Sequence, residues 1–455
     1  MHLDVVLLSR IQFAFVISFH IIFPAFTIGL AAWLATIEGA HYFTGKTIYR
    51  RVFNFWLPVF ALCFGMGVVT GIVMAFQFGT NWSLLSERTG PIQGPLLGYE
   101  AFTAFLLEAT FFGVALFGRD RVSPGFYFFA CCMVSLGTMF SSFWILCNNS
   151  WMQVPLGHTV VNGRFIPDDW WAIVSGPVVC VRWPHMLIAA YCTTALCVAA
   201  TGAWYRLKGV FSPEAVVMLR WGLGLLAVLI PIQMVIGHFN GEYVHRYQPA
   251  KFAAIEARWQ TQQPASEVLL AWPDEQTRSN LLSISIPKLG SFIASGGNWD
   301  ARETGLDVIP EQDWPPVVLP FLSFRVMVGA GLLMLAVAWI GVLLEFLGRL
   351  GKARWFLWAT FLSFPLGFIG VICGWITAEV GRQPWVVYGL LRTSEAVTPS
   401  LTGGMVVFSL LAYIVVYAVV YSFGFIYIIR LLRSGANTFP AAPAAPLAVS
   451  ERRPS

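Results

Sequence analysis

Residues 11–37 read IQFAFVISFHIIFPAFTIGLAAWLATI, and no charged side chain interrupts them. A helix needs about 20 predominantly apolar residues to span the hydrocarbon core of a membrane. Because lipid offers backbone groups no hydrogen-bond partner, a run of this kind must satisfy its own backbone as a helix. The stretch therefore predicts a membrane-spanning helix, and the same pattern recurs along the chain.

Eight further stretches meet the same criterion, at residues 54–77, 95–117, 125–147, 184–205, 217–238, 317–345, 355–378 and 404–430. These runs are too long for the tilted strands of a transmembrane barrel, which need only about 10 residues each. No internal repeat is evident. We therefore predict an all-α integral membrane protein with nine transmembrane helices.

The composition excludes soluble classes of protein. The chain has 455 residues, of which 57% are hydrophobic and only 11% charged, and its mean hydropathy is +0.69. A soluble domain carries about 25% charged residues. Membrane lipids are thus the expected surroundings, and the net charge of +5 is not taken to indicate a nucleic-acid partner. The eight cysteines form no CxxC pair, so neither a zinc site nor a disulfide framework is expected.

Basic residues in the short loops predict the orientation, because they gather on the cytoplasmic side of a membrane. They follow the odd-numbered helices, which places the N-terminus outside and the C-terminus in the cytoplasm: Lys46, Arg50, Arg51, Arg119, Arg121, Arg206, Lys208, Arg349, Lys352, Arg354, Arg430 and Arg433. We divide the chain into six helices over 1–238, a long hydrophilic loop outside the cytoplasm over 239–316, three helices over 317–431, and an Ala/Pro-rich tail over 432–455, predicted to be disordered.

Ionisable side chains inside predicted spans are candidates for function, because burying them in lipid is costly. His20 lies midway along the first helix and could ligate a metal or haem iron, or simply bond a neighbouring carbonyl. Glu100 and Glu108 lie in the third helix, about 12 Å apart along its axis and on neighbouring faces. They favour a proton path or ion ligands, and a structural salt bridge is the alternative.

Two positions near the outer ends of helices could ligate a low-spin haem. His185 opens the fifth helix and Met327 lies near the start of the seventh, and a His/Met pair suits an electron-transfer haem. Arg325 could neutralise a haem propionate, or anchor the helix at the interface. The alternative for Met327 is an ordinary core residue.

The densest polar cluster ends the eighth helix, in GWITAEVGRQPW over residues 374–385. Glu379 and Arg382 are expected to be neighbours on the last turn, with Gly381 and Pro384 ending the helix. An ordinary helix cap with interfacial tryptophans is the alternative, although the motif is long for that role.

At this motif the chain resembles subunit I of the cytochrome bd family of quinol oxidases, most closely its cyanide-insensitive oxidase branch. The resemblance covers nearly the whole chain and rests on several motifs in the same order. These motifs are LSRIQFAF (8–15) with His20, FQFGTNWS (76–83), Glu100 with Glu108, NNSWMQVP (148–155), KFAAIEARW (251–259) and AEVGRQPW (378–385).

The resemblance implies a haem-containing terminal oxidase subunit that oxidises membrane quinol and reduces O2 to water. Quinol protons are released outside, and the protons that form water are taken from the cytoplasm. The resemblance thus implies a proton gradient that arises by charge separation without pumping. The implied cofactors are a low-spin haem b, a high-spin haem b, and a haem d or a further haem b. The implied location is the inner membrane of a bacterium. The implied partners are a smaller integral membrane subunit II, with a small single-helix subunit as a further candidate.

The resemblance also implies roles for individual residues. His185 and Met327 match the axial ligands of the low-spin haem, and His20 and Glu379 match ligands at the high-spin pair. The remaining matches are Glu100 and Glu108 beside that pair, in haem coordination or proton entry, Lys251 and Glu256 in quinol oxidation, Trp375 between haems, and Arg325 and Arg382 near haem propionates.

The sequence departs from the family pattern at two points, and two other functions are alternatives to an oxidase. The hydrophilic loop is short for the family, and Val380 stands where a tyrosine is usual. A proton-coupled membrane transporter would use Glu100, Glu108 and Glu379 as its carboxylates, although such proteins often show inverted repeats. An assembly subunit without chemistry would tolerate replacement of His20, His185 and Glu379.

Overall fold

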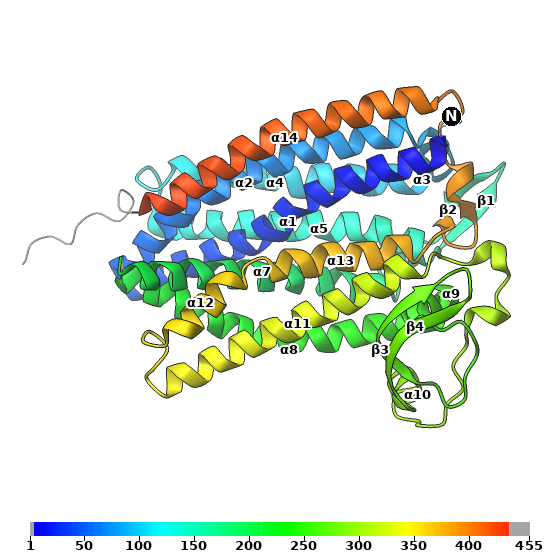
Figure 1. Ribbon diagram of the computed structural model, residues 1–455. Coiled ribbons are helices and arrows are strands. Elements are labelled where there is room, and N and C mark those ends of the chain that lie inside the picture. Colours follow the sequence, from blue (N-terminus) through cyan, green and yellow to red (C-terminus); the bar gives the residue numbers. More distant parts are fainter. Residues whose placement is uncertain (1–3, 211, 436–455) are drawn as a thin grey trace, which may run out of the picture.

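The computed structural model describes residues 4–210 and 212–435. In that part of the chain nine segments are long and apolar enough to cross a membrane, and they run side by side as one bundle (Figure 1). The nine-span helical class is thereby confirmed. The spans are α1 (Val5–Thr44), α2 (Thr47–Thr80), α3 to α4 (Ser83–Phe117), α5 (Pro124–Gln153), α6 (Trp170–Val174) with α7 (Val179–Lys208), α8 (Ser212–Tyr247), α11 (Val318–Phe346), α12 (Arg354–Leu362) with α13 (Leu366–Val380), and α14 (Gly403–Arg433).

The predicted hydrophilic loop begins later than residue 239. Helix α8 continues to Tyr247, because the polar residues after 238 are compatible with a helix even though they are not apolar. The helix stops before Pro249, since proline disfavours helical geometry in the residue that precedes it. Gln248 has left that geometry, with φ −138° and ψ 64°. Hydropathy thus marked the membrane-embedded part of this helix and not its full length.

Two spans contain breaks that the apolar runs did not predict. The third begins at Ser83 rather than at residue 95, and a π-helical turn, η1 (Ala101–Phe105), separates α3 (Ser83–Glu100) from α4 (Leu106–Phe117). The eighth is interrupted between α12 and α13, where Pro365 cannot supply a backbone donor. The predicted tail overlaps α14, which continues to Arg433, and residues 436–455 lie outside the described residues.

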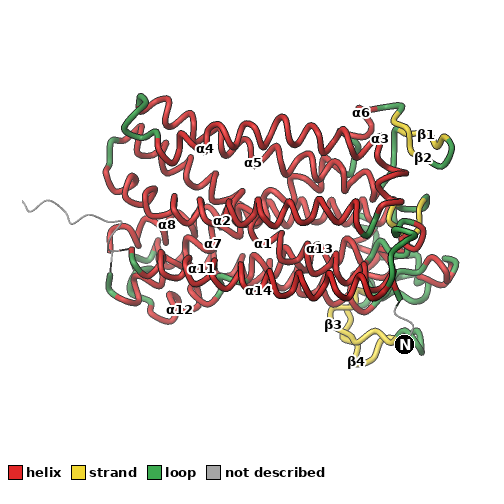
Figure 2. Tube along the Cα trace, turned by 90° about the horizontal axis from the view of Figure 1, so that it is seen from above, coloured by secondary structure: helices red, strands yellow, loops and turns green. Residues whose placement is uncertain are grey.

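Three β-hairpins and several short helices gather at the end of the bundle where the described chain begins (Figures 1 and 2). Most of these elements belong to the hydrophilic connection between α8 and α11, which corresponds to the predicted long loop. The elements are β1 (His158–Val161) with β2 (Arg164–Pro167), α9 (Pro249–Ile255), β3 (Glu267–Asp274) with β4 (Ser279–Ile286), α10 (Leu289–Ala294), η2 (Leu306–Val308), η3 (Glu311–Asp313), β5 (Trp385–Val387) with β6 (Leu391–Arg392), and η4 (Thr393–Glu395).

Helix α1 lies at the centre of the bundle and packs against α2, α5, α7, α13 and α14. Its approach to α7 depends on Gly29. A Cβ atom there would lie 2.3 Å from Thr194 Oγ1 and 2.6 Å from the Ala190 carbonyl oxygen. Small residues allow such close contact between helices in a membrane. This contact fixes α1, which carries His20, against the helix that carries His185.

Candidate functional site

His20 is held in one tautomer by its neighbour on α2. Its Nδ1 lies 2.9 Å from Thr70 Oγ1, and that hydroxyl lies 2.9 Å from the Met66 carbonyl oxygen, to which it donates. A hydroxyl has one hydrogen, so Thr70 must accept from the Nδ1–H of the imidazole. Nε2 then carries the lone pair, as an iron ligand requires. A Cβ atom at Gly71 would lie 3.3 Å from the His20 ring, so glycine allows the ring to pack closely against α2.

His185 lies beside Gln233 of α8, and each of the two side chains keeps a buried polar atom without a partner among the described residues. Its Nε2 is 3.4 Å from Gln233 Nε2 on α8. Its Nδ1 and the Gln233 side-chain oxygen have no hydrogen-bond partner among the described residues. Leaving two such atoms buried costs free energy unless a bound group takes them up. Gly237 also lies on α8 beside His185. A Cβ atom at this position would lie 3.2 Å from the imidazole ring.

Met327 faces a second glycine. It lies on α11, and a Cβ atom at Gly374 of the adjacent α13 would lie 3.1 Å from its sulfur. A thioether sulfur is one of the axial ligands that haem iron takes. The structure therefore packs both residues of the predicted His/Met pair closely against glycines of a neighbouring helix.

Trp375 connects the two histidine sites. It packs in one apolar cluster with Ile21 of α1 and Met186 of α7, which are the sequence neighbours of His20 and His185. Its indole nitrogen is buried and has no partner among the described residues. The place of this tryptophan between two haem sites stays a prediction.

Glu379 lies in the polar network at the end of α13. Its Oε1 accepts hydrogen bonds from Asn149 Nδ2 at 3.0 Å and from Gln153 Nε2 at 3.1 Å, and its Oε2 pairs with Arg382. Arg382 keeps two further buried nitrogens, Nε and Nη1, without partners among the described residues. Free guanidinium donors of this kind suit an anionic group such as a propionate. The side chain of Glu379 is 30% exposed.

The paired acids of the third span lie on one face of their helix. In a regular α-helix, residues eight apart differ by about 80°. The π-helical turn between Glu100 and Glu108 absorbs one extra residue, which reduces the difference to about 20°. Both acids face α5, where Ser141 donates to Glu100 at 2.8 Å and a Cβ at Gly137 would lie 2.6 Å from Glu108 Cγ. The expected neighbouring faces are thus corrected to a shared face.

Lys251 is buried instead of presenting its amine to solvent. Its Nζ donates to Gln153 Oε1 at 2.8 Å and to Gln248 Oε1 at 3.0 Å. Burial, with the nearby Arg182 as the second cause, holds the pKa of the Lys251 amine well below its usual range. The structure thus connects this loop residue to the Glu379 network through Gln153.

Glu256 belongs to a separate cluster. Arg325 Nη2 lies 2.7 Å from Glu256 Oε2 and 3.1 Å from Glu267 Oε1 on β3, and its Nε donates to the Val268 carbonyl oxygen. The arginine expected near a propionate therefore ties the hydrophilic loop to α11. Burial, followed by the charge of Glu256, raises the pKa of Glu267 to about 8, against the opposing effect of Arg325.

Replacing Glu267 by glutamine should flatten the pH dependence of the loop's stability. The folded pKa of about 8 exceeds the ordinary value of 4.5. The folded loop is therefore most favoured below pH 4.5 and loses stability as the pH rises towards 8, by up to about tenfold in the local opening constant per pH unit. Hydrogen exchange of β3 amides between these pH values measures the slope. The control is Glu311→Gln, an exposed partner of Arg278. An equal slope in native protein and Glu267→Gln would contradict this assignment.

Sequence reasoning missed Glu267, Asn149, Gln153 and Gln233. A usable signal existed for two of them: Asn149 and Gln153 are four residues apart in NNSWMQVP and so share a face of α5. Gln233 and Glu267 gave no comparable pattern, because only the packing of α8 and β3 brings them to their partners.

The donor set fits haem better than a bare metal ion. Within residues 4–210 and 212–435, no group of three or more His, Cys, Asp or Glu side chains is placed to hold a metal. Haem supplies its own four nitrogens, so the protein needs to provide only one or two axial ligands at each iron. His20, His185, Met327 and Glu379 lie in four separate places, each able to supply one such ligand, and unpartnered buried polar atoms lie at His185 and beside Glu379.

Comparison with known proteins identifies the family. A model of the family described as Cytochrome bd terminal oxidase subunit I matches residues 8–436. The chain is 34% identical over 450 residues to cytochrome bd ubiquinol oxidase subunit 1 of Bacillus subtilis (strain 168), covering 94% of each chain. It is 33% identical over 484 residues to cytochrome bd-II ubiquinol oxidase subunit 1 of Escherichia coli (strain K12), covering 91% of this chain and 93% of that one.

A solved structure supports the same relationship. The bd oxidase from Geobacillus thermodenitrificans superposes with a TM-score of 0.88 at 27% identity, covering 95% of this chain and 99% of that one. These similarities give no support to the transporter alternative. The chain therefore belongs to the family of cytochrome bd terminal oxidase subunit I, and it is a haem-containing subunit of a membrane quinol:oxygen oxidoreductase.

Proposed function

We propose that this chain holds three haems and the quinol site of the oxidase. His185 and Met327 would ligate a low-spin haem b, and His20 and Glu379 would ligate the high-spin pair, a haem b with a haem d or a further haem b. The observation that carries the proposal is the set of buried, unpartnered polar atoms beside these residues, on His185, Gln233, Trp375 and Arg382. When bound, the haems would accept single electrons and offer oxygen an open iron position.

The protein's own residues would orient and insulate these groups. Thr70 would keep His20 in the tautomer whose Nε2 faces iron, because its hydroxyl accepts from Nδ1. Asn149 and Gln153 would fix the Glu379 carboxylate, since both donate to its Oε1. The two free donors of Arg382 would neutralise a propionate.

The hydrophilic loop would bind quinol near α9. Lys251 and Glu256 stand at either end of this short helix, and both are nearly buried. Glu256 would take a quinol proton and release it outside, because a carboxylate accepts hydrogen bonds and protons where an amine donates them. The division into helices, loop and tail described for the sequence remains part of this proposal, with the loop starting at Gln248.

Protons for oxygen reduction would come from the cytoplasm along the third span. With the N-terminus outside and the C-terminus inside, α4 runs towards the cytoplasm, so a proton would meet Glu108 before Glu100. Their shared face towards α5 supports a relay between the two carboxyl groups, with Ser141 holding Glu100.

The protein spans a bacterial membrane several times, and its family implies a partner subunit II, quinol and O2. We propose that subunit II is the smaller integral membrane subunit, that a small single-helix subunit is a further partner, and that the membrane is the inner membrane.

The quinol site is tested with Lys251→Met and Glu256→Gln in the purified oxidase complex. Each should lower kcat/KM for quinol by about ten- to a hundredfold, the effect of losing one hydrogen bond to a charged or strongly polarised group. Dithionite should still reduce the haems to the native spectrum. Lys288→Met provides the control, because Lys288 is an exposed loop lysine paired with Asp300. If both variants keep the native kcat/KM, quinol does not bind at α9.

A further inference from the structure

Gln153, the last residue of α5, connects the loop lysine to the carboxylate at the end of α13. The residue is 2% exposed. Its Nε2 donates to Glu379 Oε1 at 3.1 Å and lies 3.4 Å from the Ala378 carbonyl oxygen. Its Oε1 accepts from Lys251 Nζ at 2.8 Å and from Gln248 Nε2 at 3.1 Å. The nitrogen of this one amide thus bonds Glu379, and its oxygen bonds Lys251.

The amide can occupy this position in only one orientation. An amide oxygen accepts and an amide nitrogen donates, while a lysine amine presents donors and a carboxylate presents acceptors. Turning the Gln153 amide over would place oxygen against the carboxylate of Glu379 and nitrogen against the amide nitrogen of Gln248, which can only donate. Both contacts would be repulsive, so each partner fixes the orientation that the other experiences.

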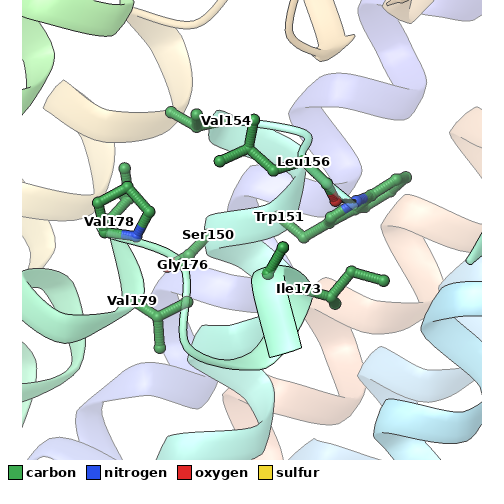
Figure 3. A pocket seen from close by; sticks show the side chains of 10 residues that line it. Ser150, Trp151, Val154, Leu156, Ile173, Gly176, Val178 and Val179 are labelled. Atoms are coloured by element: carbon green, nitrogen blue, oxygen red, sulfur yellow. Dashed lines mark hydrogen bonds between the residues drawn. The ribbon is translucent and has the colours of Figure 1, made fainter. Parts of the chain in front are cut away.

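The backbone around Gln153 is also fixed. Gln248 Nε2 donates to the Gln153 carbonyl oxygen at 3.0 Å, which ties the start of α9 to the end of α5. On the far side of this turn, Ser150, Trp151 and Val154 line a cavity of about 10 Å³ beside α6 (Figure 3). Such a cavity has room for one water molecule at most. Gln248 thus ties the end of α5 to the loop beside this small cavity.

Lys251 reaches Gln153 across the turn that follows α13. A Cβ atom at Gly381 would lie 2.9 Å from Lys251 Cγ and 3.3 Å from its Cε. Gly381 has φ −65°, a value that any residue adopts, so glycine is needed here for space and not for a left-handed turn. The stem of Lys251 thus lies against the residue two positions after Glu379.

We propose that Gln153 is a positioning residue that couples the quinol site at Lys251 to Glu379: when the site is occupied, the hydrogen bond from Gln153 to the Glu379 carboxylate changes. The inference rests on the proposed function of both residues. Hydrogen bonds in series polarise one another in a low-dielectric interior. When a quinone oxygen takes an N–H of Lys251, the Gln153 oxygen loses part of its donor, and the bond from Nε2 to Glu379 weakens. Binding at the loop then changes the electrostatic environment of the haem that Glu379 holds.

The test uses the oxidised, purified two-subunit complex, to which ubiquinone-1 or menadione is added in separate titrations. Neither quinone transfers electrons to ferric haem, so only binding is observed. Native protein should show a rise in melting temperature, which reports binding, together with a change in the high-spin haem spectrum. Gln153→Leu should keep the rise in melting temperature and lose the spectral change.

Two further variants make the outcome decisive. Gln93→Leu removes a buried amide of α3 that bonds Thr89 and touches neither Lys251 nor Glu379, and it should respond as native protein does. Gln153→Glu keeps an acceptor for Lys251 but sets two carboxylates against each other, so it should shift the high-spin spectrum before any quinone is added. It also decides the matter if Gln153→Leu fails to assemble.

The possible failures are distinguishable. A native spectral response in Gln153→Leu, or a native spectrum and response in Gln153→Glu, would overturn the coupling role of Gln153 and leave the quinol site untouched. An undiminished rise in melting temperature in Lys251→Met would instead overturn the quinol site on which the inference rests.

Discussion

Replacing Met327 by leucine should convert the low-spin haem to a high-spin form or cause its loss, and quinol oxidation should fail. Leucine is close to methionine in volume, so the substitution removes the sulfur ligand with little change in packing. Oxygen or carbon monoxide binding at the high-spin pair should survive, because His20 and Glu379 lie on α1 and α13 and are not altered. The reduced-minus-oxidised visible spectrum measures the low-spin band, and carbon monoxide difference spectra measure the high-spin pair.

Met334→Leu is the matched control for this experiment. Met334 lies on the same helix, α11, and is buried in an apolar cluster with Ala338 and Leu226. Its replacement should leave the low-spin spectrum unchanged. If the low-spin band also persists in Met327→Leu, the sulfur of Met327 is not the ligand.

Replacing Glu108 by leucine should slow oxygen turnover by about a hundredfold or more, the usual effect of removing a group that transfers protons. Quinol should still reduce the haems, because Glu108 is not among the proposed ligands. Glu100→Leu should in addition disturb the high-spin spectrum, since Glu100 lies nearer to the high-spin pair in the proposed order. An oxygen electrode with saturating quinol measures turnover.

The structure offers a second variant that moves Glu108 without changing it. Gly137→Ala would place a Cβ about 2.6 Å from Glu108 Cγ, so that carboxylate must shift. Turnover should fall in the same direction as in Glu108→Leu. Gly113→Ala on α4 is the control, because its Cβ would meet nothing within 4 Å. Full turnover in both Glu108→Leu and Gly137→Ala would show that protons take another route.

Much of the fold follows from the sequence, because hydropathy is a local property. The nine apolar runs, the hydrophilic connection and the cluster around Glu379 and Arg382 all lie where the structure has them. The errors in where the helices begin and end are of one kind. The end of α8 at Tyr247 and the start of α3 at Ser83 extend beyond the apolar runs, because a helix continues wherever its side chains find partners.

The candidate site was less accessible to sequence reasoning, because it depends on rotation and on contacts between distant segments. No pattern indicated the π-helical turn that brings Glu100 and Glu108 onto one face. The sequence also did not indicate that Lys251 and Glu256 belong to different hydrogen-bond clusters, because both lie in one short motif. Lys251 bonds Gln153 on α5, whereas Glu256 bonds Arg325 on α11. The glycines at 71, 237 and 374 acquire meaning only when the neighbouring helix is in place.

In the proposed function this one chain holds three haems, with His20, His185, Met327 and Glu379 as axial ligands. Acid-pyridine extraction of the purified complex, with mass identification of each macrocycle and quantification against the chain, tests it most directly. We predict three haems per chain, of which at least two are haem b and the third is haem b or haem d. A complex that is active with quinol and oxygen but yields fewer than three haems per chain would contradict the account.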